Sequence, residues 1–189
     1  EILAKTEQNG HVCLYQHLKN VADIARAVAK HIGFDEQIAV EGALLHDIGK
    51  TSPVFQQSLI SPNKKPGSVF RHEIASLFFL SLVCQEHRDA VIDMIVAHHK
   101  SMYKDVRELG ILDLDDTSDC FKEHSKLFPE WSHIAIDILE SLGMKTHKIT
   151  LEEAEENYEY VIDYCDSRKK GCSEWRGLLM AADHMASAM

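Results

Sequence analysis

The chain has 189 residues and a formal net charge of −10 at pH 7. Its length fits one domain with a single sizeable core. No apolar run approaches the roughly 20 residues that cross a bilayer, and the first residues lack the pattern of a signal peptide, so we expect no membrane segment. The acidic balance argues against a broadly basic surface for nucleic acid, although bound metal ions would create a local positive site.

The five cysteines are scattered, and none forms a C-x-x-C pair. Their spacing favours neither a disulfide framework nor a thiolate zinc site. We therefore expect reduced thiols in a cytoplasmic protein. The twelve histidines, in contrast, are many for a chain of this length.

The first half of the chain reads as helix, helix and loop. Residues 14–34 place apolar side chains on one stripe, and Gly33 is expected to end that helix. Residues 35–50 predict a second helix with an acidic first turn. Residues 51–68 contain three of the four prolines, which predicts a loop with at most a short helix.

The helical pattern continues beyond this loop, with one interruption. Residues 101–120 are irregular and acidic, and we expect an insertion or a flexible connection there. The expected helices cover residues 69–87, 89–100, 129–143, 150–167 and 173–189. Thr150 and Glu153 match a capping box at the start of one of them. With no alternating strand of useful length and no internal repeat, the sequence predicts one all-α domain over residues 1–189, a helical bundle.

Two polar pairs, His46-Asp47 and His98-His99, stand in otherwise apolar helical sequence. An imidazole or a carboxylate on a buried face costs free energy unless it is paired, hydrogen-bonded or bound to a metal. Adjacent positions on a helix point about 100° apart. The members of each pair can therefore face different ions, which favours a dinuclear metal site over a simple structural zinc.

Two further polar residues raise the same question. His17 lies on the apolar stripe of the first helix, and Asp183 is a carboxylate in the apolar last helix. Imidazole and carboxylate ligands contributed by several helices suit first-row divalent metals. Each of several other histidines is more simply an ordinary surface or hydrogen-bonded residue: His11, His31, His87, His124, His133 and His147.

The order of these residues resembles the HD superfamily of metal-dependent phosphohydrolases. The resemblance rests on His17, H-D-I-G-K at 46–50, His72, H-H at 98–99 and Asp183. The presence of His72 and of the paired histidines makes the chain similar to the two-metal branch of that superfamily, which implies a helical bundle with a dinuclear site at its centre.

Within that branch, three segments look like the CRISPR-associated HD nuclease, the nuclease module of the type I interference nuclease-helicase. They are residues 46–56, 70–76 and 177–187. Lys100 stands where the family often has Gly, and His184 stands where it often has an aromatic residue. Neither difference removes a ligand.

The resemblance implies two divalent metal ions. One would be held by His17, His46, Asp47 and Asp183, and the other by His72, His98 and His99, with Asp47 as the bridge. Manganese, iron, cobalt or nickel is expected, with magnesium or zinc as alternatives. Lys50 would lie near the ions and contact a phosphate. The alternative for Lys50 is a solvated lysine at the end of a helix, where the macrodipole favours it.

The implied reaction is hydrolysis of phosphodiester bonds in single-stranded DNA by a metal-activated water during CRISPR interference. The implied partners are a helicase, either removed from this chain or a separate polypeptide, and the RNA-guided surveillance complex. Because the chain is acidic, we expect the helicase to deliver the strand. Six cations could form a short track for it: Lys64, Lys65, Arg71, Lys100, Lys104 and Arg107. An ordinary solvated surface is the alternative for them.

Two other functions stay open. The first is an HD phosphohydrolase that acts on a small nucleotide, a dinucleoside polyphosphate or a cyclic dinucleotide. The G-Y-P element expected near the histidine pair of cyclic-di-GMP phosphodiesterases is absent from the sequence. The second is a degenerate, non-catalytic HD scaffold, which the presence of all seven ligand residues disfavours.

Overall fold

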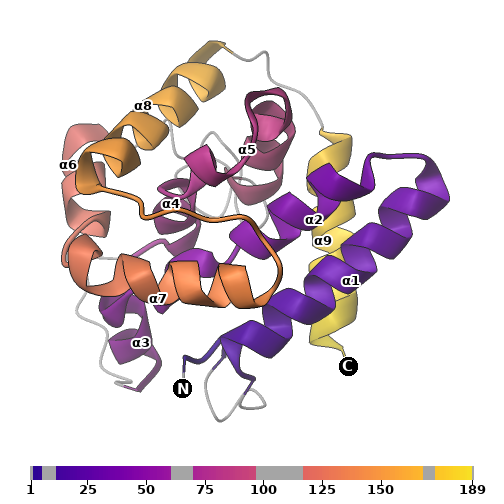
Figure 1. Cartoon of the computed structure of the whole chain (residues 1–189), viewed down its shortest axis with the longest axis horizontal. Coiled ribbons are helices and arrows are strands. Elements are labelled where there is room, and N and C mark those ends of the chain that lie inside the picture. Colours follow the sequence, from indigo (N-terminus) through magenta and orange to yellow (C-terminus); the bar gives the residue numbers. More distant parts are fainter. Residues whose placement is uncertain (1, 6–11, 61–69, 97–116, 168–172, 189) are drawn as a thin grey trace, which may run out of the picture.

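A computed structural model describes residues 2–5, 12–60, 70–96, 117–167 and 173–188 (Figure 1). Within these residues every regular element is helical, apart from an isolated antiparallel bridge between Leu3 and Cys13. The predicted all-α fold is therefore confirmed. None of the described helices has the length and apolar character needed to cross a membrane.

Nine α-helices and three short 3-10 segments make up the described part of the chain. The α-helices are α1 (Leu14–Ile32), α2 (Glu36–Leu45), α3 (Pro53–Ile60), α4 (His72–Leu77), α5 (Arg88–Val96), α6 (Thr117–His124), α7 (Phe128–Ser141), α8 (Leu151–Ser167) and α9 (Glu174–Ser187). The 3-10 segments are η2 (Ile48–Thr51), η3 (Leu80–Leu82) and η4 (Gln85–His87).

The first two helices begin and end where the sequence predicts. The stripe on α1 faces the core, and Gly33 ends the helix in the left-handed conformation (φ 77°), which glycine adopts without steric cost. Asp35 then caps α2, because its side chain accepts hydrogen bonds from the backbone N–H groups of Gln37 and Ile38. The two helices pack against each other as an antiparallel pair (Figure 1).

Two predicted helices are shorter than expected. The helix predicted over 35–50 stops at Leu45, and the chain leaves helical geometry at Asp47 (φ −116°, ψ 3°) before η2. The helix predicted over 69–87 is divided into α4, η3 and η4, and the extended residues Val83 and Cys84 separate η3 from η4. The apolar run that suggested one continuous helix is buried on every side, so it has no amphipathic stripe that would require a regular helix.

Other boundaries differ in smaller ways. The loop predicted over 51–68 contains the short helix α3, and residues 61–69 lie outside the described residues. α5 begins as expected, but residues 97–100 of that predicted helix also lie outside them. The prediction of irregular structure over 101–120 was wrong at its end, because α6 begins at Thr117. Residues 101–116 are not among those described.

The capping box at the start of α8 is half formed. The Thr150 hydroxyl accepts a hydrogen bond from the backbone N–H of Glu153 (3.1 Å), as predicted. The Glu153 carboxylate does not turn back to the cap. It accepts hydrogen bonds from Ser81 (2.6 Å) and His147 (2.8 Å), and so ties α8 to η3.

The core has two parts. α1, α2, α5 and α9 pack together on one side (Figure 1). On the other side, aromatic rings from the α4 region and α7 pack in edge-to-face and tilted contacts, with Phe78, Phe79, Phe128 and Trp131 all fully buried. The segment from His46 to Thr51 lies where these two parts meet, since η2 contacts α4 and α7.

Gly49 provides a test of this junction. A β-carbon at Gly49 would collide with the backbone of His72 and Ser76 on α4. We expect Gly49→Ala to lower the free energy of unfolding by about 3 kcal/mol, measured by urea denaturation, because backbone atoms cannot yield as a flexible side chain can. Gly177→Ala is the matched control: no atom lies within 4 Å of its added β-carbon, and it should raise stability by about 0.5–1 kcal/mol. Equal effects would contradict the proposed close contact.

Candidate metal centre

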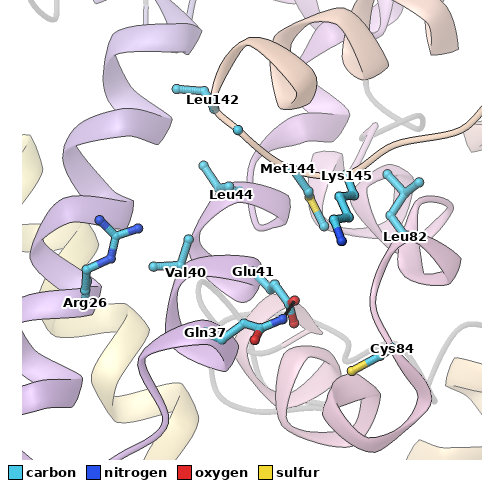
Figure 2. A pocket seen from close by; sticks show the side chains of 11 residues that line it. Arg26, Gln37, Val40, Glu41, Leu44, Leu82, Cys84, Leu142, Met144 and Lys145 are labelled. Atoms are coloured by element: carbon cyan, nitrogen blue, oxygen red, sulfur yellow. Dashed lines mark hydrogen bonds between the residues drawn. The ribbon is translucent and has the colours of Figure 1, made fainter.

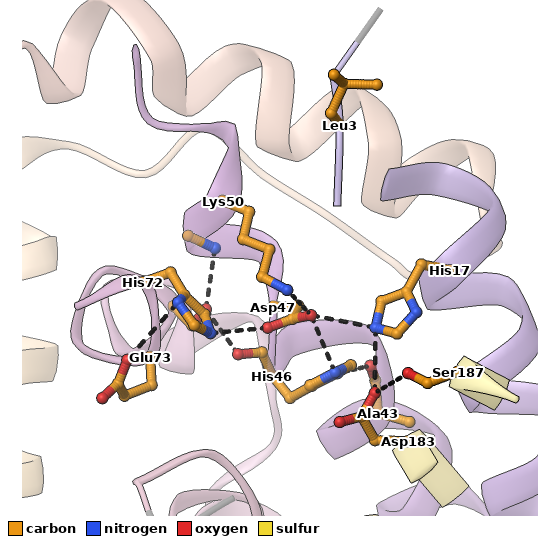
Figure 3. A network of polar contacts seen from close by, with 12 residues as sticks. Leu3, His17, Ala43, His46, Asp47, Lys50, His72, Glu73, Asp183 and Ser187 are labelled. Carbon is orange, nitrogen blue, oxygen red and sulfur yellow. Dashed lines mark hydrogen bonds and ion pairs between the residues drawn. The ribbon is translucent and has the colours of Figure 1, made fainter. Parts of the chain in front are cut away.

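Asp47 is the centre of a buried polar cluster (Figure 3). Its Oδ2 atom lies 2.6 Å from Lys50 Nζ, 3.1 Å from His17 Nε2 and 3.4 Å from His46 Nε2. Its Oδ1 atom lies 3.0 Å from His72 Nε2. One carboxylate therefore meets four nitrogen groups, three at one oxygen and one at the other.

The backbone turn that presents Asp47 is fixed by Ser76 on α4. The Ser76 hydroxyl donates a hydrogen bond to the His46 carbonyl (3.0 Å) and accepts one from the Gly49 N–H (2.9 Å). Both ends of the turn are thus bonded to one side chain. α2 ends at Leu45, and the turn that follows directs Asp47 toward His17 and His72.

His46 is held in one tautomer. Its Nδ1 atom lies 2.6 Å from the carbonyl oxygen of Ala43. Because a carbonyl only accepts, the proton must be on Nδ1, and Nε2 is the ring nitrogen that faces Asp47. A backbone partner of this kind commonly orients a metal-ligating histidine.

His17 connects α1 to the last helix. Its Nε2 atom lies 3.3 Å from Asp183 Oδ1 on α9, in addition to its contact with Asp47. His17 is buried, whereas the Asp183 side chain keeps 16% of its surface exposed. The first and last helices of the described chain therefore place an imidazole and a carboxylate side by side, as the family resemblance implied.

The pKa values of both carboxyl groups in the cluster are lowered. Burial acts to raise the pKa of Asp47, but Lys50, His46 and His72 hold it well below its usual range. Burial likewise acts to raise the pKa of Asp183, but the hydrogen bond with His17 and the charges of His46 and His17 together outweigh it, so the net shift of this pKa is downward. Both carboxyl groups are therefore ionised at neutral pH, as metal ligands must be.

The two histidines on either side of Asp47 are shifted in opposite directions. Burial acts to lower the pKa of His17, but Asp183 and Asp47 outweigh it and the pKa is raised. For His72, burial is again the largest influence, and the single carboxylate of Asp47 does not offset it, so its pKa is lowered. The shift of His72 therefore favours the neutral form that binds a metal, whereas the shift of His17 favours the protonated form, which has to release its proton before it binds one.

The donor set fits a divalent ion. One ligand atom from each of His17, His46 and Asp47 lies within 4.8 Å of the others, and all three residues are buried. Two imidazole nitrogens and a carboxylate oxygen are the mixed donors that first-row divalent metals accept. This cluster could hold one ion, with Asp183 beside it.

Of the three histidines predicted to hold the second ion, the structure describes only His72. His72 faces the other oxygen of Asp47, and the ring of Phe55 meets it edge to face. His98 and His99 lie outside the described residues. The ligand set of the second ion therefore stays a prediction.

Lys50 is buried at the cluster and is not a solvated helix-end lysine. Besides its contact with Asp47, its ammonium group lies 5.8 Å from the ring centroid of Phe55. The prediction of a cationic track for DNA was wrong for Arg71. This residue is buried and pairs with Glu73 (2.7 Å), so it is not a surface contact for DNA. The other five track residues lie outside the described residues.

The remaining histidines behave as ordinary residues where they are described. His31, His133 and His147 are exposed. His87 pairs with Glu41 (2.7 Å). His124 is buried and accepts a hydrogen bond from the backbone N–H of Arg71 (2.9 Å). His11 lies outside the described residues.

Sequence reasoning did not single out two residues that shape the site, Ser76 and Glu73. Ser76 fixes the turn, and Glu73 Oε2 lies 3.8 Å from His72 Nδ1. Glu73 carried a signal, as a carboxylate next to a candidate ligand in an apolar helix. A serine in a helix carried none.

An all-α bundle with a buried His–Asp cluster defines a class of metal-binding helical domains. The HD domain family matches residues 14–166, most of the chain. The chain therefore belongs to the HD domain family, which indicates a metal-dependent phosphohydrolase. No curated protein and no solved structure matches the chain.

The opposite pKa shifts can be measured directly. In metal-stripped protein, NMR titration of the imidazoles should show His17 losing its proton above pH 6.5 and His72 losing its proton below pH 6.5. His17→Gln and His72→Gln assign the signals. Because His17 is protonated below its raised pKa, metal affinity should increase by up to about tenfold per pH unit as the pH rises toward that pKa. Titration of His17 below pH 6.5 would contradict this electrostatic account.

Asp183 and its neighbour provide a matched test of ligation. Asp183→Ala should weaken binding of manganese at least about tenfold, measured by equilibrium dialysis with elemental analysis, because it removes the carboxylate beside His17. His184→Ala alters the next residue, which is exposed, and should leave affinity unchanged. If both variants bind manganese like the parent protein, Asp183 is not a ligand.

Proposed function

We propose that this HD domain is a nuclease that hydrolyses phosphodiester bonds of single-stranded DNA in CRISPR interference. The proposal begins from the family, which indicates a metal-dependent phosphohydrolase. The finer substrate class rests on the resemblance of residues 46–56, 70–76 and 177–187 to the CRISPR-associated HD nuclease.

The observation that carries the proposal is the two-sided environment of Asp47. His17 and His46 face one of its oxygens, and His72 faces the other. A carboxylate with nitrogen ligands on both oxygens is suited to bridge two ions. This arrangement supports the assignment of His72, with His98 and His99, to a second ion.

Divalent ions held at these residues would polarise a phosphate and lower the pKa of a water that attacks phosphorus. The side chains of the cluster have distinct tasks around that chemistry. Asp47 and Asp183 supply ionised ligands, and the carbonyl of Ala43 keeps His46 in its ligating tautomer. Lys50 is a cation at the same carboxylate, where it would stabilise the charge that develops on the phosphoryl oxygens.

The acidic chain bears on how a strand reaches this site. A net charge of −10 does not favour strong binding of DNA through counterion release. We therefore propose that a helicase domain or subunit and the RNA-guided surveillance complex bring single-stranded DNA to the domain in the cytoplasm. The burial of Arg71 removes one cation from the predicted track and is consistent with this dependence.

Cleavage of labelled single-stranded DNA tests the proposal. Metal-stripped protein receives manganese, iron(II), cobalt, nickel, magnesium or zinc, one at a time. We expect cleavage with at least one of these ions, and a loss of at least about a hundredfold in rate for Asp47→Asn, since several kcal/mol of transition-state stabilisation depend on the ions it holds. Asp23→Asn, an exposed aspartate on the helix that carries His17, is the control and should cleave normally.

The same experiment separates the alternatives. Protein that binds two ions but cleaves no DNA with any of them would reject the nuclease, and a screen of nucleotides and cyclic dinucleotides would then identify a small-molecule phosphohydrolase. Metal binding without hydrolysis of any of these substrates would point to a scaffold.

A further inference from the structure

A cavity of about 580 Å³ lies along α2, and none of the proposed metal ligands lines it (Figure 2). We call it the α2 cavity. Its walls come from α1, α2, the η3–η4 region and the segment that follows α7. The volume falls in the range of about 300–1,000 Å³ that is typical of small-molecule sites.

One face of α2 is turned toward this cavity. Gln37, Val40, Glu41 and Leu44 line it, at the i, i+3, i+4 and i+7 spacing of a single helical stripe. The other face of α2 carries Ala39, Gly42 and Ala43, all buried in the core. α2 therefore packs with small residues on one side and presents larger, mixed side chains to the cavity on the other.

The apolar part of the cavity comes from both walls. Val40 and Leu44 lie on α2, and Leu82, Leu142 and Met144 face them from η3 and from the end of α7 (Figure 2). Leu44 is buried, whereas Val40, Leu82, Leu142 and Met144 are half-buried and keep apolar surface for the cavity. Such a floor favours the aromatic or aliphatic part of a ligand.

The charged side chains that line the cavity are two cations, Arg26 and Lys145, and one anion, Glu41. Glu41 is already satisfied, because Gln37 Nε2 donates a hydrogen bond to it (2.9 Å) and His87 Nδ1 lies 2.7 Å from it. Arg26 and Lys145 also line the cavity, and within the described residues neither makes a hydrogen bond or an ion pair. In Figure 2 Lys145 extends into the space near Glu41, and Arg26 lies on the α1 side. The charge left for a ligand is therefore positive, in a chain whose net charge is −10.

We propose that the α2 cavity binds a small organic anion that has an apolar ring or chain and one acidic group. The apolar part would lie on the Leu44 and Met144 floor, and the positive charges of Arg26 and Lys145, which line the cavity from opposite sides, would together attract the acidic group. This site is independent of the proposed nuclease activity. It lies on the helix that leads directly into His46, so an occupied cavity would contact the helix that carries a metal-binding residue.

A matched pair of fluorescent probes tests the proposal with the full chain. 8-Anilinonaphthalene-1-sulfonate carries an aromatic body and one sulfonate, and N-phenyl-1-naphthylamine has the same body without the charge. We expect saturable binding of the sulfonate at one site per chain, at least about fivefold tighter than binding of the neutral probe. That ratio corresponds to a pair of partly exposed cations.

Charge variants identify the residues that recognise the anion. Arg26→Gln and Lys145→Gln should each weaken the sulfonate about three- to fivefold and leave the neutral probe within twofold of its original affinity. Lys30→Gln on α1 and Lys148→Gln after α7 remove the same charge from exposed residues that do not line the cavity, and both should bind like the parent protein. Equal weakening by the control variants would mean that net charge alone attracts the probe, and would overturn the proposal.

Alkylation of Cys84 tests whether the probe binds in the α2 cavity. Cys84 is exposed and lines the cavity, whereas Cys120 and Cys165 are buried. Saturating sulfonate probe should slow alkylation of Cys84 at least about threefold, measured by mass spectrometry of its peptide, and leave the alkylation of half-buried Cys13 unchanged. Unchanged alkylation of Cys84 in the saturated protein would place the probe elsewhere and reject the α2 cavity as its site.

Discussion

The structure depends on the burial of one carboxylate. Asp47 is 1% exposed, and an ionised carboxylate in such a position is strongly unfavourable unless several partners compensate for the lost hydration. The partners come from four separate elements: α1 supplies His17, the end of α2 supplies His46, η2 supplies Lys50 and α4 supplies His72. Packing these elements around a common centre is what satisfies the charge.

The same constraint explains why the backbone is irregular at this point. A continuous helix through residues 35–50 would carry His46 and Asp47 on a regular surface, about 100° apart. The break at Asp47 instead turns its side chain toward α1, α4 and α9, and Ser76 bonds both ends of the turn. Gly49 allows the close approach of α4 that this turn needs. The regular helix therefore ends before Asp47, and the polar contacts of the cluster replace further helical hydrogen bonds.

Positive charge is distributed unevenly over this acidic chain. At the metal cluster, Lys50 is engaged with Asp47, so its proposed contact with a phosphate would require bound ions to take its place at that carboxylate. At the α2 cavity, Arg26 and Lys145 make no ion pair within the described structure. The two regions lie along one helix and offer different chemistry: candidate metal ligands at its end, and an apolar floor with cations along its side.

The sequence by itself determined the all-α class, the first helix with its Gly33 stop, and the His–Asp cluster, because each follows from local periodicity or from the cost of burying polar groups. His17, His46, Asp47, His72 and Asp183 were all identified in that way or by resemblance. Only the tertiary structure decided where α2 ends, that Lys50 is buried, that Arg71 pairs internally and that one side of α2 faces a cavity. These features depend on which distant segment packs against each residue, and a local pattern contains no record of that partner.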